Sequence, residues 1–212
     1  MKTPEDHTYF PPVEMATEDG LLAYGGDLSV DRLLYAYKHG IFPWFEEGQP
    51  ILWWSPDPRM VLYPKKLKIS KSMKQVLRNN SFHLTFNKDF KSVIANCASI
   101  KREGQNGTWI TSGMQEAYLK LHELGIAQSV EVWQDEELVG GLYGIYLQDK
   151  NVFCGESMFA KVSNASKFAF IKMVEKLSAV GVKLIDCQVY NPHLESLGAE
   201  EISREEFLKF LK

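Results

Sequence analysis

The sequence of 212 residues is long enough to bury a sizeable core, either as one large domain or as a small domain attached to a larger one. Its net charge of −3 argues against a protein that coats nucleic acid nonspecifically, and the longest apolar runs are too short to span a membrane. The N-terminal stretch MKTPEDHTYFPP carries charges and prolines where a signal peptide needs apolar residues, so we expect a cytoplasmic protein.

The cysteine and histidine residues give no metal-binding pattern. Cys97, Cys154 and Cys187 lie far apart, without CxxC or Cys/His ligand spacing, and the five histidines are scattered. Such cysteines are typical of a reducing compartment, where they pack as small buried hydrophobes. We therefore predict neither a metal site nor a cofactor.

Residues 1–62 form a first region, rich in Pro, Gly and Trp. One helix is predicted in it, beginning after a Ser29 cap and ending at Gly40. The segments FPWF and ILWWSPDPR follow, and their prolines favour extended, irregular chain. We predict a small N-terminal domain here and a larger domain over residues 63–212.

A basic run, KKLKISKSMKQVLR, opens the larger domain and contains no acidic residue. Ser70 is a suitable N-cap, and the helix after it puts Lys71, Lys74 and Arg78 on one face by their i, i+3, i+7 spacing. A solvated basic helix explains this run taken alone. The alternative is a surface that binds a phosphate backbone, which needs support from elsewhere in the chain.

The rest of the larger domain is predicted as a mixed α/β sheet, with helices first, then a meander of strands, then a helix leading into another strand. This order resembles an acyltransferase fold of the N-acetyltransferase type. Asn87 is the expected cap of the second helix, and Ser112 with Gln115 forms a capping box on the third. The predicted helices are 70–79, 88–97, 112–124, 164–180 and one beginning after a Ser203 cap; the predicted strands are 129–134, 137–147, 152–154 and 183–188.

Two features of the strands leave two interpretations open. Gly140, Gly141 and Gly144 lie inside one strand, where glycines mark a bulge, a close approach by a ligand, or tight packing of a helix on the sheet. In FCGESMF, Glu156 stands between apolar flanks just after a strand. Its carboxylate belongs either to a surface turn or to the wall of a pocket.

The stretch KLIDCQVYN (183–191) begins as a buried strand and then places a carboxylate near a carboxamide. Side chains alternate along a strand, so Asp186 and Gln188 are expected on one side and Cys187 on the other. The pair either serves catalysis or closes the end of the sheet with a structural hydrogen bond.

The helix before this strand is apolar on two sides, so it is expected to be buried on both. One stripe can pack on the sheet while the other lines a cavity; alternatively, both belong to the core. The stripes are Phe170, Met173 and Leu177, and Phe168, Ile171 and Val174.

Several motifs occur together and in order: FPWF, ILWWSPDPR, ISKSMK, TWIT, LHELG, VEVW, LVGGLYG, FCGESMF, NASK, and KLIDCQVYN with HLESLGA. From about residue 20 onward the chain resembles the bacterial leucyl/phenylalanyl-tRNA–protein transferase family. The resemblance implies an acetyltransferase-like second domain. It also implies transfer of Leu, Phe or Met from aminoacyl-tRNA to an N-terminal Arg or Lys of an acceptor protein, which is thereby marked for N-degron proteolysis.

The resemblance also assigns catalytic roles. In the family, residues matching Asp186 and Gln188 are proposed to form a relay in which the carboxylate polarises the amide that receives the N–H of the attacking amine. A neutral carboxamide is not a useful base, so we expect Gln188 to orient the amine. Glu156 is expected to bind the amino group of the donor or to attract the cationic acceptor.

Binding roles follow in the same way. Trp44 and Trp109 match aromatic residues that contact the terminal adenosine, and Lys71, Lys74 and Arg78 become a surface for the tRNA backbone. Trp53 and Trp54 are expected to pack internally. The residues that match the pocket for the donor side chain are Leu142, Phe153, Gly155, Phe170, Met173, Leu177 and Ile185.

Two other functions remain compatible with parts of the pattern. One is another acyltransferase of the same fold, which would use acyl-coenzyme A or a cell-wall precursor. The coenzyme A version would need a Q/R-x-x-G-x-G/A loop leading into a helix, a motif that we do not find. A noncatalytic tRNA-binding module would have no use for Glu156, Asp186 and Gln188 together. Nothing in the sequence pattern demands more than a monomer.

Overall fold

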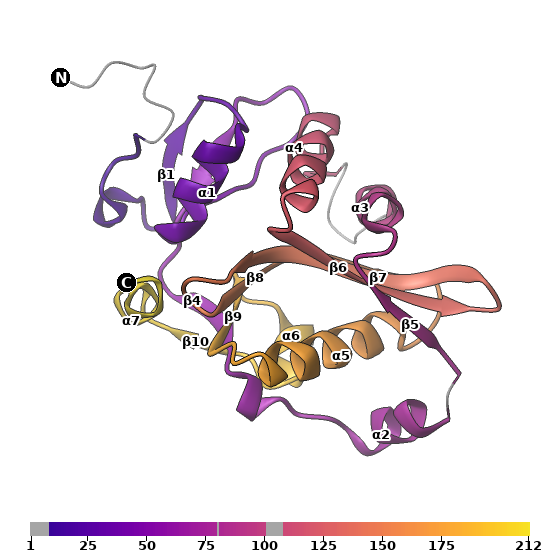
Figure 1. The fold of residues 1–212 in the computed structure, drawn as a ribbon. Helices are drawn as coiled ribbons and strands as arrows, with labels where there is room; N and C mark the ends of the chain where they lie inside the picture. The colour runs from indigo at the N-terminus through magenta and orange to yellow at the C-terminus, as the bar shows by residue number, and fades with distance from the viewer. Residues whose placement is uncertain (1–8, 80, 101–107) are drawn as a thin grey trace.

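The computed structural model describes residues 9–79, 81–100 and 108–212 (Figure 1). Its strands are β1 (Leu21–Tyr24), β2 (Phe42–Pro43), β3 (Leu52–Trp54), β4 (Arg59–Leu62), β5 (His83–Phe86), β6 (Ala127–Gln134), β7 (Glu137–Leu147), β8 (Val152–Ala160), β9 (Leu184–Gln188) and β10 (Glu200–Ile202). The α-helices are α1 (Val30–Lys38), α2 (Lys71–Arg78), α3 (Phe90–Ser99), α4 (Ser112–Glu123), α5 (Ala165–Ala179), α6 (Pro192–Ser196) and α7 (Arg204–Leu208). Short 3-10 helices lie at Val13–Met15, Pro64–Lys66 and Lys209–Leu211.

Two sheets organise the described residues. The smaller has the order β1-β3-β2, and the larger has the order β10-β4-β9-β8-β7-β6-β5. Strands β5 to β8 form an antiparallel meander, after which α5 crosses over to β9, which is parallel to β8. The predicted mixed α/β class is confirmed, with a small N-terminal part beside the larger sheet (Figure 1).

Helices cover the two faces of the large sheet unequally. In Figure 1, α5 lies along one face while α3 and α4 lie on the other, beside α1 and the small sheet. Leu33, Tyr37 and Trp53 of the N-terminal part share one buried cluster with Tyr118 and Tyr143 of the larger part. The N-terminal part therefore closes the face opposite α5. The division at residue 62 stays a prediction, since β4, which ends there, belongs to the larger sheet.

Local sequence signals explain where several helices begin. Ser29, Ser70 and Ser203 accept the backbone N–H three residues on, as the capping argument predicts. Two predicted caps are wrong. Asp89 caps α3 in place of Asn87, whose φ of 57° ends the preceding strand, and Thr111 caps α4 in place of Ser112.

The glycines of β7 allow close packing rather than approach by a ligand. A Cβ on Gly140 would lie 2.6 Å from Cβ of Ala165 in α5, and one on Gly141 would lie 2.6 Å from the Val130 carbonyl oxygen. A Cβ on Gly144 would overlap the carbonyl oxygen of Cys154, next to a β-bulge. Of the interpretations left open, packing and a bulge are therefore confirmed.

Candidate active site

A cavity of about 270 Å³ lies between α5, the strands β7 to β9 and the segment around Trp44. The residues that line it are mostly apolar, and Glu156 of β8 and Gln188 of β9 are among the polar ones. All nine residues predicted to bind the donor and the adenosine line this cavity: Trp44, Trp109, Leu142, Phe153, Gly155, Phe170, Met173, Leu177 and Ile185.

Helix α5 supplies one side of the cavity. Phe170, Met173 and Leu177 are almost fully buried, yet they line the cavity, as the family resemblance implies and as one of the two interpretations of the stripes allows. Phe168 and Ile171 of the second stripe are buried in the same apolar cluster as the first stripe but do not line the cavity, whereas Val174 also reaches the cavity. The helix is thus buried on two sides.

The tryptophans of the N-terminal part have different places: Trp44 lines the cavity, and Trp54 packs against Trp44. Trp44 remains 38 % exposed, and its ring centroid lies 5.9 Å from that of Trp54. The indole N–H of Trp54 donates to the Trp44 carbonyl oxygen at 2.7 Å. Trp53 is fully buried, and its indole N–H donates to the Gly25 carbonyl oxygen. Trp44 is thus a partly exposed ring on the cavity wall, supported by Trp54.

Glu156 is buried at the cavity wall, where a hydrogen-bond network joins it to α4, β9 and α1. The Tyr118 hydroxyl donates to its Oε2 at 3.0 Å, the Gln188 amide donates to its Oε1 at 3.0 Å, and Tyr37 bonds to the Tyr118 hydroxyl. Burial raises the pKa of Glu156 to about 7, although the two tyrosines and Gln188 favour the ionised form. Of the two interpretations left open for Glu156, the pocket wall is confirmed.

Asp186 has different partners from those that the relay hypothesis requires. Its carboxylate is fully buried, and it accepts two hydrogen bonds from Arg59, at 2.8 Å and 2.7 Å. It also accepts the backbone N–H of Gln188 at 2.9 Å. The carboxylate that meets the Gln188 side-chain amide is Glu156, so any polarisation of that amide comes from Glu156.

Three residues of this network were not singled out from the sequence. Arg59 stands in the otherwise apolar strand RMVL, and a charge in such a strand is a signal of a buried partner. Tyr37 and Tyr118 give no comparable signal, because a tyrosine on an amphipathic helix is ordinarily a core residue. Their hydroxyl groups converge only through the packing of α1 against α4.

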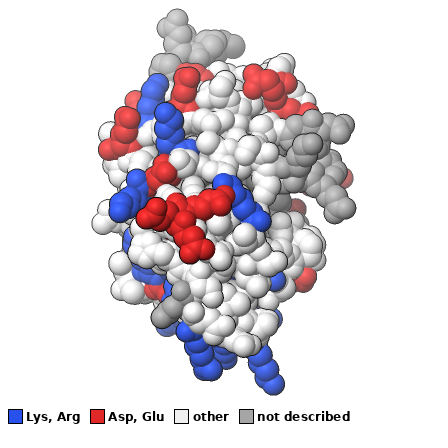
Figure 2. All heavy atoms as spheres, turned by 90° about the vertical axis from the view of Figure 1, so that its right-hand side faces the viewer, with Lys and Arg blue, Asp and Glu red and all other residues white. Residues whose placement is uncertain are grey.

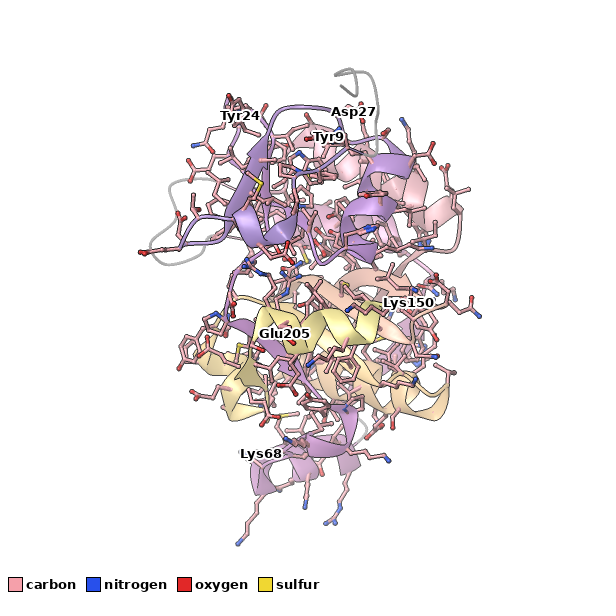
Figure 3. All side chains as sticks on the ribbon, turned by 90° about the vertical axis from the view of Figure 1, so that its left-hand side faces the viewer. Tyr9, Tyr24, Asp27, Lys68, Lys150 and Glu205 are labelled. Carbon is pink, nitrogen blue, oxygen red and sulfur yellow. The ribbon has the colours of Figure 1, made fainter. Side chains whose placement is uncertain are left out.

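The predicted basic face is exposed at the end of the molecule occupied by α2. Lys71, Lys74 and Arg78 are all exposed. Figure 2 shows Lys and Arg side chains gathered at this lower end, apart from the acidic residues in the middle of that face. Lys68, labelled in Figure 3, extends the same basic end.

The cysteines fit the packing role for two of the three positions. Cys97 and Cys154 are buried, whereas Cys187 is half-buried and lines the cavity. Burial raises the pKa of the Cys187 thiol, which keeps it in the unreactive form. Within the described ranges, no group of three or more His, Cys, Asp or Glu side chains is arranged to hold a metal, and no helix is long and apolar enough to cross a membrane.

Comparisons with known proteins cover nearly the whole chain. The model of the leucyl/phenylalanyl-tRNA protein transferase family matches residues 61–212, and that of its N-terminal domain matches residues 26–57. A leucyl/phenylalanyl-tRNA–protein transferase of Christiangramia forsetii is 67% identical over 202 residues, covering 95% of each chain. One of Flavobacterium johnsoniae is 65% identical over 204 residues, covering 96% of this chain and 95% of that protein.

Among solved structures, a GCN5-related N-acetyltransferase from Kribbella flavida aligns with a TM-score of 0.42 and 10% identity, over 80% of this chain and 60% of that one. This likeness is remote, and the mixed α/β assignment rests on the topology described above. The family matches and the two close relatives are decisive. The chain belongs to the leucyl/phenylalanyl-tRNA–protein transferase family.

Proposed function

We propose that this protein transfers leucine, phenylalanine or methionine from aminoacyl-tRNA to the N-terminal Arg or Lys of an acceptor protein. The new peptide bond marks the acceptor for N-degron proteolysis, in the cytoplasm where charged tRNA is present. The observation that carries this proposal is the cavity, whose mostly apolar lining also includes Glu156, Gln188 and Trp44. Every element of the site comes from one chain, so a monomer suffices.

The apolar wall suits the side chain of the donor amino acid. Leu142, Phe153 and Leu177 offer dispersion contacts but no polar group, so leucine, phenylalanine and methionine can all bind. Such pockets discriminate weakly, since each methylene is worth about 1–3 kcal/mol. Stacking of the terminal adenine on Trp44 or Trp109 would add about 1–3 kcal/mol without requiring a particular base.

The reaction is aminolysis of an activated ester, for which positioning supplies much of the rate. The α-amine of the acceptor attacks the ester carbonyl, the C–N bond forms, the bond to the ribose oxygen breaks, and one amine proton must reach that oxygen. Gln188 orients the amine through its amide oxygen, because its N–H group is held by Glu156. Glu156 is the carboxylate next to this amide.

The pKa of Glu156, about 7, suits it to exchange a proton near neutral pH. In the proposed mechanism it accepts the amine proton and returns a proton to the departing ribose hydroxyl, so it is unchanged at the end of the reaction. Asp186 is a poor candidate for this step, because it is fully buried in its ion pair with Arg59 and, unlike Glu156, does not line the cavity.

Transfer of labelled phenylalanine from Phe-tRNA to a peptide beginning with Arg tests the proposed function. A peptide beginning with Gly is the matched control. Acyl-coenzyme A, offered as the donor in place of Phe-tRNA, tests the alternative acyltransferase chemistry. We expect label on the Arg peptide alone. Equal labelling of the Gly peptide would overturn the acceptor specificity, and no labelling by a folded protein would overturn the function.

A further inference from the structure

Arg59 makes contacts on every side of its guanidinium group and is only 1 % exposed. Nε and Nη2 donate to the two carboxylate oxygens of Asp186, forming a bidentate ion pair. Nη1 donates to the carbonyl oxygen of Gly40 at 3.2 Å. The rings of Phe42 and Phe207 lie 4.8 Å and 4.6 Å from Cζ, as cation–π contacts.

These contacts join four parts of the fold at one point. Arg59 itself lies on β4, Asp186 on β9, Phe207 on α7, and Gly40 and Phe42 on the segment that leads to Trp44. That segment is tightly packed, since a Cβ on Gly40 would lie 2.9 Å from Leu208 Cδ2. Arg59 therefore bridges the wall that carries Trp44 and the strand that carries Gln188.

Gln188 depends on the same ion pair for its conformation. Its φ of 67° is a left-handed value that a residue with a side chain rarely adopts. The Asp186 carboxylate holds this conformation by accepting the Gln188 backbone N–H, and the side chain then reaches Glu156. A displaced Asp186 carboxylate would release the backbone of Gln188 and, with it, the amide that meets Glu156.

We propose that Arg59 is a positioning residue of the active site and that Asp186 acts through Arg59 and the Gln188 backbone rather than on the reacting atoms. This inference rests on the proposed function. Asp186 does not line the cavity, and each of its oxygens accepts at least one hydrogen bond. Its charge serves to fix Arg59, and Arg59 fixes the two walls of the site relative to each other.

Rescue of one substitution by another tests this inference. The kcat and KM of phenylalanine transfer to the Arg peptide are measured for the wild type, Asp186→Asn, Arg59→Gln and the double variant. Each single substitution leaves a buried charge without its partner, and we expect kcat to fall about 100-fold through misplacement of Gln188. The double variant has no unpaired charge, so we expect its kcat to exceed that of Asp186→Asn about tenfold.

A double variant no faster than Asp186→Asn would show that the carboxylate itself is needed and would overturn the inference. An Arg59→Gln variant with the kcat of the wild type would overturn it as well. No transfer by the wild type would contradict the proposed function, and the inference with it. Transfer by the wild type together with either of the two results above would contradict the inference alone.

A conservative substitution of Arg59 and a control substitution of an exposed ion pair complete the test. Arg59→Lys keeps the charge that pairs with Asp186 but loses the bidentate geometry, so it tests the positioning role even if Arg59→Gln fails to fold, and we expect its kcat to be lowered. Wild-type kcat in Arg59→Lys would contradict the positioning role. The control is Lys38→Gln with Asp149→Asn, an ion pair whose side chains are 41% and 52% exposed and which lies outside the cavity lining. Its kcat should match the wild type.

Discussion

The Gln188 side-chain amide donates to Oε1 of Glu156 at 3.0 Å, and this bond joins the end of β9 to a bulge in β8. The bulge arises because Tyr143 pairs with Ser157 while Gly144 pairs with Gly155, which leaves Glu156 without a partner in the register. The extra residue turns toward β9 and the two tyrosines. A carboxylate and an amide from two neighbouring strands are thereby held together at the cavity wall.

Replacing Tyr118 with Phe should shift the pH dependence of transfer. The Tyr118 hydroxyl favours the ionised form of Glu156, so its loss should raise the pKa of Glu156 further. The acid limb of kcat/KM then moves to higher pH. Below that limb, activity falls about tenfold for each unit by which the pKa rises, and it recovers in alkaline buffer.

Titration of the acceptor amine also contributes to this profile, but equally in every variant, so the comparison isolates Glu156. Tyr146→Phe is the matched control and should keep the wild-type profile. Tyr146 lies on β7 and packs against the apolar cluster that contains the buried residues of α5. Loss of activity in Tyr118→Phe by the same factor at every pH would contradict the assignment of Glu156 as the titrating group.

Substituting Glu156 with Gln should change how stability depends on pH. The pKa of Glu156 is about 7 in the folded protein and 4.5 ordinarily, so between these values the folded state binds more protons than the unfolded state. The contribution of Glu156 to the free energy of unfolding should therefore fall as the pH rises from 4.5 to about 7, by on the order of 3 kcal/mol.

Glu156→Gln cannot titrate, so it should lose this dependence and become more stable relative to the wild type at pH 8 than at pH 5. Urea unfolding of both proteins at these two pH values measures the difference. An unchanged difference would mean that burial does not raise the pKa of Glu156.

Much of the candidate site could be predicted because its residues occur in motifs with recognisable spacing. The stripe of Phe170, Met173 and Leu177 follows from helical periodicity, and its place on the cavity wall follows from the family resemblance. The meander β6 to β8 follows from apolar alternation, although β8 continues to Ala160 through Glu156, six residues beyond its predicted end. The bulge explains this error, since it interrupts the alternation that marks a strand.

The partners of Asp186 could not be predicted from local sequence. Arg59 lies 127 positions away in the chain, and the two residues meet only because β4, within the Pro-rich stretch, inserts between β9 and β10. Prolines around a strand of four residues conceal it from periodicity arguments. The relay hypothesis, which came from the family resemblance, pairs Asp186 with the Gln188 side chain, whereas in the structure that side chain bonds to Glu156.

Replacing Gly155 with Ala should narrow the donor pocket without unfolding the protein. A Cβ at this position meets only the Asp186 carbonyl oxygen, at 3.6 Å, and otherwise points into open space. The change should alter the free energy of unfolding by less than about 1 kcal/mol. The KM for Phe-tRNA should rise more than that for Leu-tRNA, because the larger side chain needs the volume that the new methyl group fills.

The control is Gly113→Ala on α4, where a Cβ is also accommodated and which does not line the cavity. Its two KM values should equal those of the wild type. An equal change for both donors in Gly155→Ala would show that Gly155 does not lie beside the donor side chain.

Neutralising the basic face of α2 should weaken tRNA binding in a salt-dependent manner. Lys71, Lys74 and Arg78 are exposed at the end of the molecule opposite α4 (Figure 1), so replacing all three with Gln should leave the fold intact. Each tRNA phosphate that is no longer neutralised should reduce the slope of log affinity against log salt by about 0.7–0.9. Transfer from a donor shortened to aminoacyl-adenosine should be unaffected, because such a donor lacks the tRNA backbone.

Lys120→Gln on α4 removes a charge from an exposed residue at the other end and should keep the wild-type slope. A triple variant with an unchanged slope would mean that the basic face is merely solvated and that the tRNA backbone lies elsewhere.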